Sequence, residues 1–124
     1  MDKVEKILLV DDDDIFLMLA KINIEKALPN ASIFTASNGE EAMEFIIDKK
    51  QNVDIIFLDL NMPIMDGWDF LEQMKVREKV DQKIIVVTSS IDPSDKRRAE
   101  ENPLVTSMVE KPLDKHKISL AIKS

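Results

Sequence analysis

Four runs of mainly hydrophobic residues, each ending at or close to a polar side chain, set the pattern of this chain. They cover residues 7–10, 55–58, 84–87 and 105–109. Strands of a parallel sheet are covered by helices on both faces, so they are typically continuous apolar stretches rather than alternating ones. We therefore expect these four runs to be buried parallel strands.

Segments with helical spacing separate the runs. After the first run, apolar residues recur three and four positions apart from Phe16 to Leu28, and Pro29-Asn30 then ends the pattern. Residues 31–36 read as a short second strand. Strands that alternate with helices indicate repeated β-α units, and we expect five of them.

The starts of the later helices carry local signals. Ser37 and Glu40 have the spacing of a capping box, which predicts a second helix reaching about residue 49. Asp92 is an expected N-cap with Pro93 at the first helical position, and Asp114 is expected to cap the last helix. A third helix should carry the apolar positions 68, 70, 71 and 74, after a loop broken by proline and glycine.

Composition limits the class of protein. With 124 residues, 44% hydrophobic and 33% charged, the chain fits one globular domain over residues 1–124, with no second or output domain visible. A net charge of −7 disfavours nucleic acid and anionic membrane as direct partners. No cysteine, signal peptide or membrane-spanning run is evident, so we expect a cytoplasmic protein.

The polar residues that end the runs predict a binding site. Asp11 and Asp12 follow the first run, Asp59 the second and Thr88 the third, while Lys111 lies just beyond the fourth. In open α/β sheets, ligands bind beyond the carboxyl ends of the strands. Three carboxylates, a hydroxyl and a lysine should therefore meet at one edge of the sheet.

The chemistry of this set points to a divalent cation and a phosphoryl group. Closely spaced carboxylates repel one another, and a hard cation with oxygen ligands relieves that repulsion. Mg²⁺ typically takes one or two carboxylates together with waters and phosphate oxygens. Lys111 offers a positive charge and Thr88 a hydrogen bond to the oxygens of a transferring phosphoryl group, and a carboxylate can act as covalent nucleophile.

Four motifs in their order and spacing resemble the receiver domains of two-component response regulators, of the single-domain chemotaxis type. The motifs are Val10-Asp11-Asp12, Leu58 to Pro63 with Asp66-Gly67, Val87-Thr88-Ser89, and Glu110-Lys111-Pro112. The resemblance spans nearly the whole chain. It implies a flavodoxin-like, doubly wound (βα)5 fold with a five-stranded parallel sheet of order 2-1-3-4-5. This strand order is known from a member of the receiver family.

The resemblance also assigns metal ligands. Asp12 and Asp59 would bind Mg²⁺ directly, Asp11 would hold it through water, and Asn61 would contribute its backbone carbonyl. These four residues are the expected metal site. No other cofactor is implied.

The remaining roles concern phosphoryl transfer and the response to it. The resemblance makes Asp59 the phosphoacceptor, places Thr88 and Lys111 on phosphoryl oxygens, and implies a cis bond between Lys111 and Pro112. Receivers usually carry tyrosine or phenylalanine three residues before the lysine. This aromatic side chain works as a switch together with the threonine. This chain has Met108 there. Because the methionine thioether is flexible, we expect phosphorylation to shift the population between the two conformations less than in receivers that carry the aromatic residue.

The function that these residues imply is phosphorylation-operated signalling. The phosphoryl group would come from a phosphohistidine on a sensor histidine kinase or histidine phosphotransfer protein. The face formed by the fourth helix, fifth strand and fifth helix would then change its affinity for a downstream protein of unknown identity, as a monomer or a phosphorylation-dependent homodimer. The chain would catalyse only its own phosphorylation and dephosphorylation. This function requires that the Asp59 carboxylate be reachable from solvent.

Two other functions stay open at this stage. Asp11 and Asp13 after an apolar strand resemble the haloacid dehalogenase superfamily, whose phosphohydrolases would use Asp11 as nucleophile. That family also needs an acidic pair beyond the lysine, and here only Asp114 follows it. The other alternative is a scaffold that is never phosphorylated, which fits Met108 but not the full acidic set.

Overall fold

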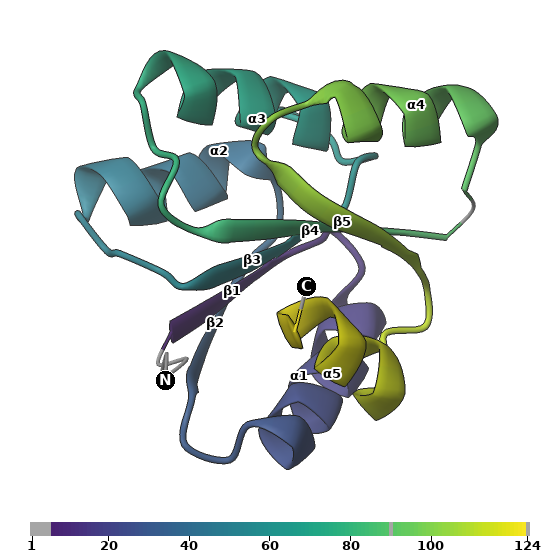
Figure 1. Cartoon of the computed structure of the whole chain (residues 1–124). Helices are drawn as coiled ribbons and strands as arrows, with labels where there is room; N and C mark the ends of the chain where they lie inside the picture. The colour runs from purple at the N-terminus through teal and green to yellow at the C-terminus, as the bar shows by residue number, and fades with distance from the viewer. Residues whose placement is uncertain (1–5, 90, 124) are drawn as a thin grey trace.

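The computed structural model describes residues 6–89 and 91–123, and its centre is a five-stranded parallel sheet of order β2-β1-β3-β4-β5 (Figure 1). The strands are β1 (Lys6–Val10), β2 (Ser32–Ala36), β3 (Ile55–Leu58), β4 (Lys83–Thr88) and β5 (Val105–Glu110). The predicted doubly wound order is confirmed. Strand order reverses between β1 and β3, which puts the carboxyl ends of these two strands beside each other.

Helices cover both faces of the sheet (Figure 1). The helices α1 (Asp14–Ala27) and α5 (Lys115–Lys123) lie on one face, and α2 (Gly39–Met43), α3 (Gly67–Val76) and α4 (Pro93–Glu101) lie on the other. A π-helical turn, η1 (Glu44–Asp48), continues α2 to the predicted end near residue 49. The arrangement is a three-layer sandwich with a core on each side of the sheet.

The two cores explain why the central strands are continuously apolar. Successive side chains of a strand point to opposite faces. Leu8 and Val10 of β1 therefore pack against α2 and α3, while Ile7 and Leu9 pack against α1 and α5. All four side chains are buried, as are all residues of β3. Helices on both faces leave no solvated side on which polar residues would alternate.

The last strand differs from the prediction of a buried strand. β5 lies at the edge of the sheet, and its residues are half-buried or exposed. A register shift also interrupts its pairing with β4, since Ile84 pairs with Val105 and Ile85 with Ser107, leaving Thr106 without a partner position. A strand with one neighbour has less to pack against, which explains the polar residues within it.

Helix caps account for several isolated polar residues. The Asp13 carboxylate accepts hydrogen bonds from the N–H groups of the first turn of α1, and Asp92 and Asp114 cap α4 and α5 as predicted. The prediction of Ser37 as N-cap of α2 is wrong by one residue. Asn38 is the cap, accepting from Glu41 N–H, and the Glu41 carboxylate accepts from Ser37 N–H. Serine and asparagine are both favoured at the N-cap, so the chain offers two adjacent candidates for this position.

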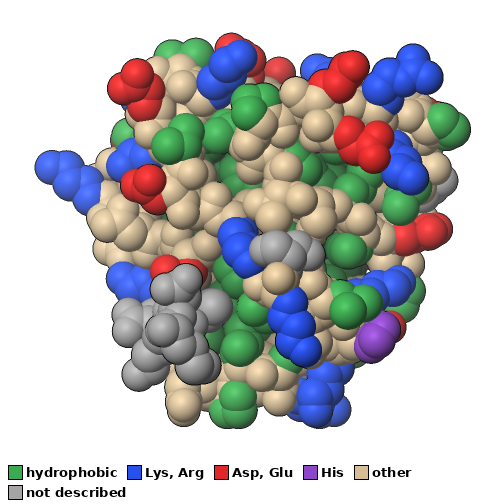
Figure 2. Space-filling model, in the orientation of Figure 1, with side chains coloured by type: hydrophobic (Ala, Val, Ile, Leu, Met, Phe, Trp, Pro, Cys, Tyr) green, Lys and Arg blue, Asp and Glu red, His purple; other side chains and the backbone are tan. Residues whose placement is uncertain are grey.

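Acidic and basic side chains are interspersed over the face drawn in Figure 2. Within the described ranges 6–89 and 91–123, no helix combines the length and the apolar character needed to cross a membrane.

Candidate functional site

Main-chain hydrogen bonds continue past the strand ends and fix the backbone of the predicted site residues. Asp59 N–H donates to Val10 O at 2.9 Å, Lys111 N–H donates to Thr88 O at 2.7 Å, and Asp11 N–H donates to the last carbonyl of β2 at 3.0 Å. The polar side chains that follow different strands are therefore held by the sheet itself. The loops beyond them carry the chain away into the next helix.

The three predicted carboxylates meet at this edge. Asp11, Asp12 and Asp59 each have an oxygen within 4.8 Å of an oxygen of the other two. Asp11 is 1% exposed, whereas Asp12 lies open to solvent. Asp59 is also largely buried, and its side chain keeps 8% of its surface exposed.

Lys111 supplies the positive charge of the cluster. Its Nζ lies 2.7 Å from Asp11 Oδ2 and 3.9 Å from Asp59 Oδ1. The ammonium also lies 4.4 Å from the ring centroid of Phe16, a cation–π distance. In the sequence, Phe16 is one position of a helical pattern, and nothing in its spacing marks it as a contact of the lysine. The bond between Lys111 and Pro112 is cis, as the resemblance implied.

Asp59 has a markedly altered affinity for protons. Burial, together with the neighbouring Asp11 and Asp12 carboxylates, raises its pKa from 3.8 to about 6, although Lys111 and the Leu60 N–H lower it. Burial is the largest cause, ahead of the mutual repulsion on which the sequence argument relied. A cation placed among these oxygens would favour the ionised carboxylate.

The donor set fits a hard divalent cation. The three clustered side chains offer carboxylate oxygens only, and the exposed Asp12 leaves one side open to water. Mg²⁺ prefers oxygen ligands and usually keeps several waters. Asp11, Asp12 and Asp59 are the side chains that would hold it. Asn61 lies exposed in the loop after Asp59, and its backbone role stays a prediction.

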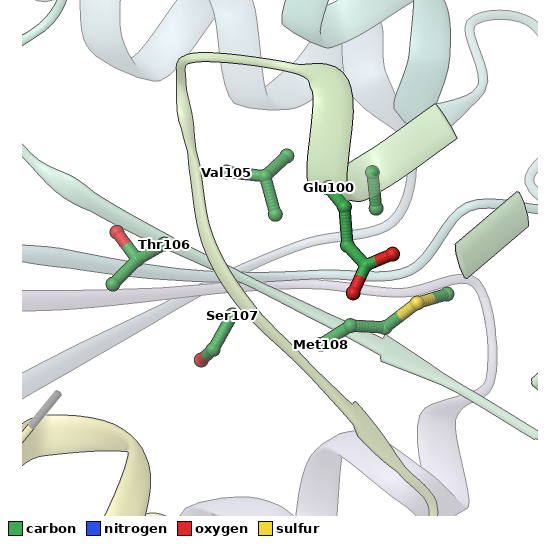
Figure 3. Close-up of a pocket in the computed structure, with 6 residues that line it drawn as sticks. Glu100, Val105, Thr106, Ser107 and Met108 are labelled. Atoms are coloured by element: carbon green, nitrogen blue, oxygen red, sulfur yellow. The ribbon is translucent and has the colours of Figure 1, made fainter. Parts of the chain in front are cut away.

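The two predicted switch residues occupy different surroundings. Thr88 is buried at the end of β4. Met108 is half-buried on β5 and, together with Ala99 and Glu100 of α4, lines a pocket of about 210 Å³ (Figure 3). Thr88 thus lies at the strand ends with the acidic cluster, and Met108 lies on the side of the sheet edge that faces α4.

Comparison with known proteins places the chain in one family. The family model for the response regulator receiver domain matches residues 7–123. The chain belongs to this family. A crystal structure of a two-component response regulator from Cytophaga hutchinsonii superposes on this receiver domain with a TM-score of 0.89 at 27% identity, covering 98% of this chain and 96% of that one.

Curated relatives of the receiver domain are response regulators and related signalling proteins. A two-component response regulator of Arabidopsis thaliana is 38% identical over 94% of this chain and 80% of its own length. The alkaline phosphatase synthesis transcriptional regulatory protein PhoP of Bacillus subtilis is 33% identical, and a hybrid signal transduction histidine kinase of Dictyostelium discoideum is 42% identical over 62 residues. The chain spans 36% of the Bacillus protein and 5% of the Dictyostelium kinase.

Proposed function

We propose that this receiver domain takes a phosphoryl group from a phosphohistidine onto Asp59 in the presence of Mg²⁺. One observation carries the proposal: the largely buried Asp59 carboxylate shares a cluster of oxygens with Asp11 and Asp12 and has the Lys111 ammonium at 3.9 Å. That combination provides a nucleophile, a set of oxygens for a hard cation and a positive charge for phosphoryl oxygens.

The transfer is a displacement at phosphorus. An Asp59 carboxylate oxygen attacks the phosphorus atom, the P–N bond to the donor imidazole breaks, and the imidazole nitrogen keeps the electron pair and takes up a proton. Lys111 and Thr88 then hold phosphoryl oxygens. Bound Mg²⁺ would neutralise charge on the same oxygens. Hydrolysis reverses the state when water attacks phosphorus and the bond to the Asp59 oxygen breaks.

A histidine kinase or a histidine phosphotransfer protein is the proposed donor. The similarity to part of a hybrid histidine kinase supports this class of partner, because such a protein combines a kinase with a receiver-like segment in one chain. The negative net charge argues against nucleic acid as a direct partner. The proposed setting is the cytoplasm.

The proposed output is a change in the face formed by α4, β5 and α5. Phosphorylation would draw Thr88 toward the phosphoryl group and alter the packing of Met108 beside α4. The altered face would then bind a downstream protein, or a second copy of the chain, with a different affinity. Met108 stands where receivers usually have an aromatic residue. We therefore expect phosphorylation to shift the population between the unphosphorylated and phosphorylated conformations less completely.

Phosphorylation by a small donor tests the proposal directly. The chain is incubated with Mg²⁺ and acetyl phosphate and then examined by intact mass spectrometry. We expect a phosphoryl adduct in the wild type and in Asp14→Asn, an exposed acid of α1. The adduct should be absent from Asp59→Asn. An adduct on Asp59→Asn, or none on the wild type, would contradict the proposal.

The geometry gives no support to the alternative hydrolase with Asp11 as nucleophile. Asp13, the second acid of that motif, is exposed, and its Oδ1 accepts hydrogen bonds from Ile15 N–H and Phe16 N–H at the start of α1. The Asp11 carboxylate is itself engaged, with Oδ1 accepting from Asp13 N–H and Oδ2 paired with Lys111. Because both of its oxygens have close partners, the Asp11 carboxylate is a poorer candidate nucleophile than that of Asp59.

A further inference from the structure

The loop that carries Lys111 is held by side chains from two helices. Lys117 of α5 donates from Nζ to Glu110 O at 2.7 Å and to Pro112 O at 3.2 Å. Asn23 of α1 donates from Nδ2 to Leu113 O at 3.1 Å. These contacts join segments far apart in the sequence.

The contacts of Lys117 bracket Lys111. The two carbonyls that it binds belong to the residues immediately before and after Lys111, and Lys111 N–H is itself bonded to Thr88 O at 2.7 Å. The backbone of Lys111 is thereby fixed on three sides. From this backbone its side chain reaches Asp11 and lies 3.9 Å from Asp59.

We propose that Lys117 is a positioning residue, which holds the loop and thereby places the Lys111 ammonium for phosphoryl transfer to Asp59. This inference rests on the proposed function. Hydrogen bonds from an ammonium group are stronger than neutral ones, so two of them on one loop are an effective restraint. A misplacement of about 1 Å in a reacting group can cost on the order of 10²-fold in rate. Loss of the restraint should therefore slow the reaction without removing any group from the site.

A purely local role in capping α5 would not depend on the Lys117 side chain. The capping bond runs from the Lys117 backbone N–H to Asp114 Oδ1 at 2.8 Å, and any substitution except proline retains it. Lys117→Met keeps most of the length of the side chain and removes only the ammonium. The helix start and the capping bond are thus preserved in the variant that tests the loop contacts.

The first measurement compares rates of phosphorylation by acetyl phosphate at saturating Mg²⁺. We expect Lys117→Met to slow the reaction by about tenfold or more, whereas Lys117→Arg, which retains donors, should recover most of the rate. Lys115→Met is the matched control, because it removes the same charge from an exposed position of the same helix. We expect it to stay within about twofold of the wild type. An unchanged rate in Lys117→Met would overturn the inference.

A double-substitution cycle shows whether Lys117 acts through Lys111. In a Lys111→Met background there is no ammonium left to position, so Lys117→Met should cause no further loss of the remaining rate. A general loss of stability would slow both backgrounds equally. Equal slowing in the presence and absence of Lys111 would therefore overturn the positioning role.

Amide hydrogen exchange at Lys111 tests the loop without phosphorylation. Its N–H is bonded to Thr88 O, and we expect faster exchange in Lys117→Met but not in Lys115→Met. Unchanged exchange would overturn the inference even where the wild type is readily phosphorylated. Faster exchange in a protein whose wild type takes no phosphoryl group would instead overturn the proposed function and leave the hold on the loop intact.

Discussion

Gly67 lies directly against the main chain of Asp59. A Cβ atom at position 67 would be 2.5 Å from Asp59 O and 2.8 Å from Leu60 Cα, and Gly67 N–H donates to Leu60 O at 2.9 Å. The first residue of α3 therefore packs on the backbone that carries the Asp59 carboxylate, the proposed phosphoacceptor. Only glycine has room there, because the atoms in the way belong to the backbone.

Gly67→Ala should displace this backbone. We expect a loss of about 1–3 kcal/mol in the free energy of unfolding, the usual range for overpacking, together with slower phosphorylation of Asp59. Urea unfolding and the acetyl phosphate rate measure the two effects. Asp69→Ala changes an exposed residue in the same turn and should leave the phosphorylation rate near that of the wild type. Equal rates in Gly67→Ala and the wild type would contradict the prediction.

The raised pKa of Asp59 predicts how stability depends on pH. The unfolded chain releases this proton near pH 3.8 and the folded protein near pH 6. Between these values the folded state binds more protons, so the contribution of Asp59 to the free energy of unfolding falls as pH rises. Above about pH 6 the full penalty applies, on the order of 1–3 kcal/mol.

Asp59→Asn should therefore stabilise the protein at pH 8 and give little gain at pH 4. Urea unfolding of both proteins at each pH, in the presence of a chelator, measures the difference. Added Mg²⁺ should reduce the gain, since a cation also relieves the buried charge of the wild type. A gain of the same size at both pH values would show that the substitution acts by some route other than the carboxylate charge.

Removal of the exposed acid should weaken metal binding. We expect Asp12→Asn to lower the affinity for Mg²⁺ by at least about tenfold, or about 1.4 kcal/mol, because one negative oxygen of the cluster is lost. Isothermal titration calorimetry measures the affinity. Asp14→Asn removes an equal charge three residues from Asp11 but outside the oxygen cluster, and it should have a much smaller effect. An equal loss of Mg²⁺ affinity in the two variants would show that only the net charge matters and would contradict the prediction.

Restoring an aromatic residue at the switch position should sharpen the response. Phenylalanine has fewer rotatable bonds than methionine, and the pocket of about 210 Å³ beside Met108 offers space for a ring. We expect Met108→Phe to show larger amide shift changes over α4 and β5 on addition of beryllofluoride and Mg²⁺. Met18→Phe, at an exposed position of α1, is the control. A wild type that already moves fully to a second state would contradict the idea of softer coupling.

The buried strands and most helix starts could be predicted from the sequence, because continuous apolar runs and capping residues are local signals. The family's strand order implies the edge position of β5, whereas its local residue pattern alone predicts a buried strand. Ser37 and Asn38 are adjacent residues that could each cap α2. The capping-box spacing of Ser37 and Glu40 favoured Ser37, whereas the structure has Asn38 as the cap.

The site was predictable to the extent that it lies at strand ends. Asp11, Asp59 and Lys111 each follow a hydrophobic run, so the sheet brings them together. Contacts made by two side chains in the first turns of helices were not predictable. Phe16 beneath Lys111 and Lys117 on the neighbouring carbonyls have no spacing that distinguishes them from core and surface positions. Only the packing of α1 and α5 against the strand ends reveals them.

Asp11, Asp59, Thr88 and Lys111 come from the ends of four different strands, and no two of them are neighbours in the chain. A bound group that touches all four would tie β1, β3, β4 and β5 together, and an unfolded chain could not bind it. By mass action, such a ligand at a hundredfold excess over its Kd would add about 2.7 kcal/mol to the stability of the fold. A rise in melting temperature would then report that such a group is bound, without any knowledge of a downstream partner.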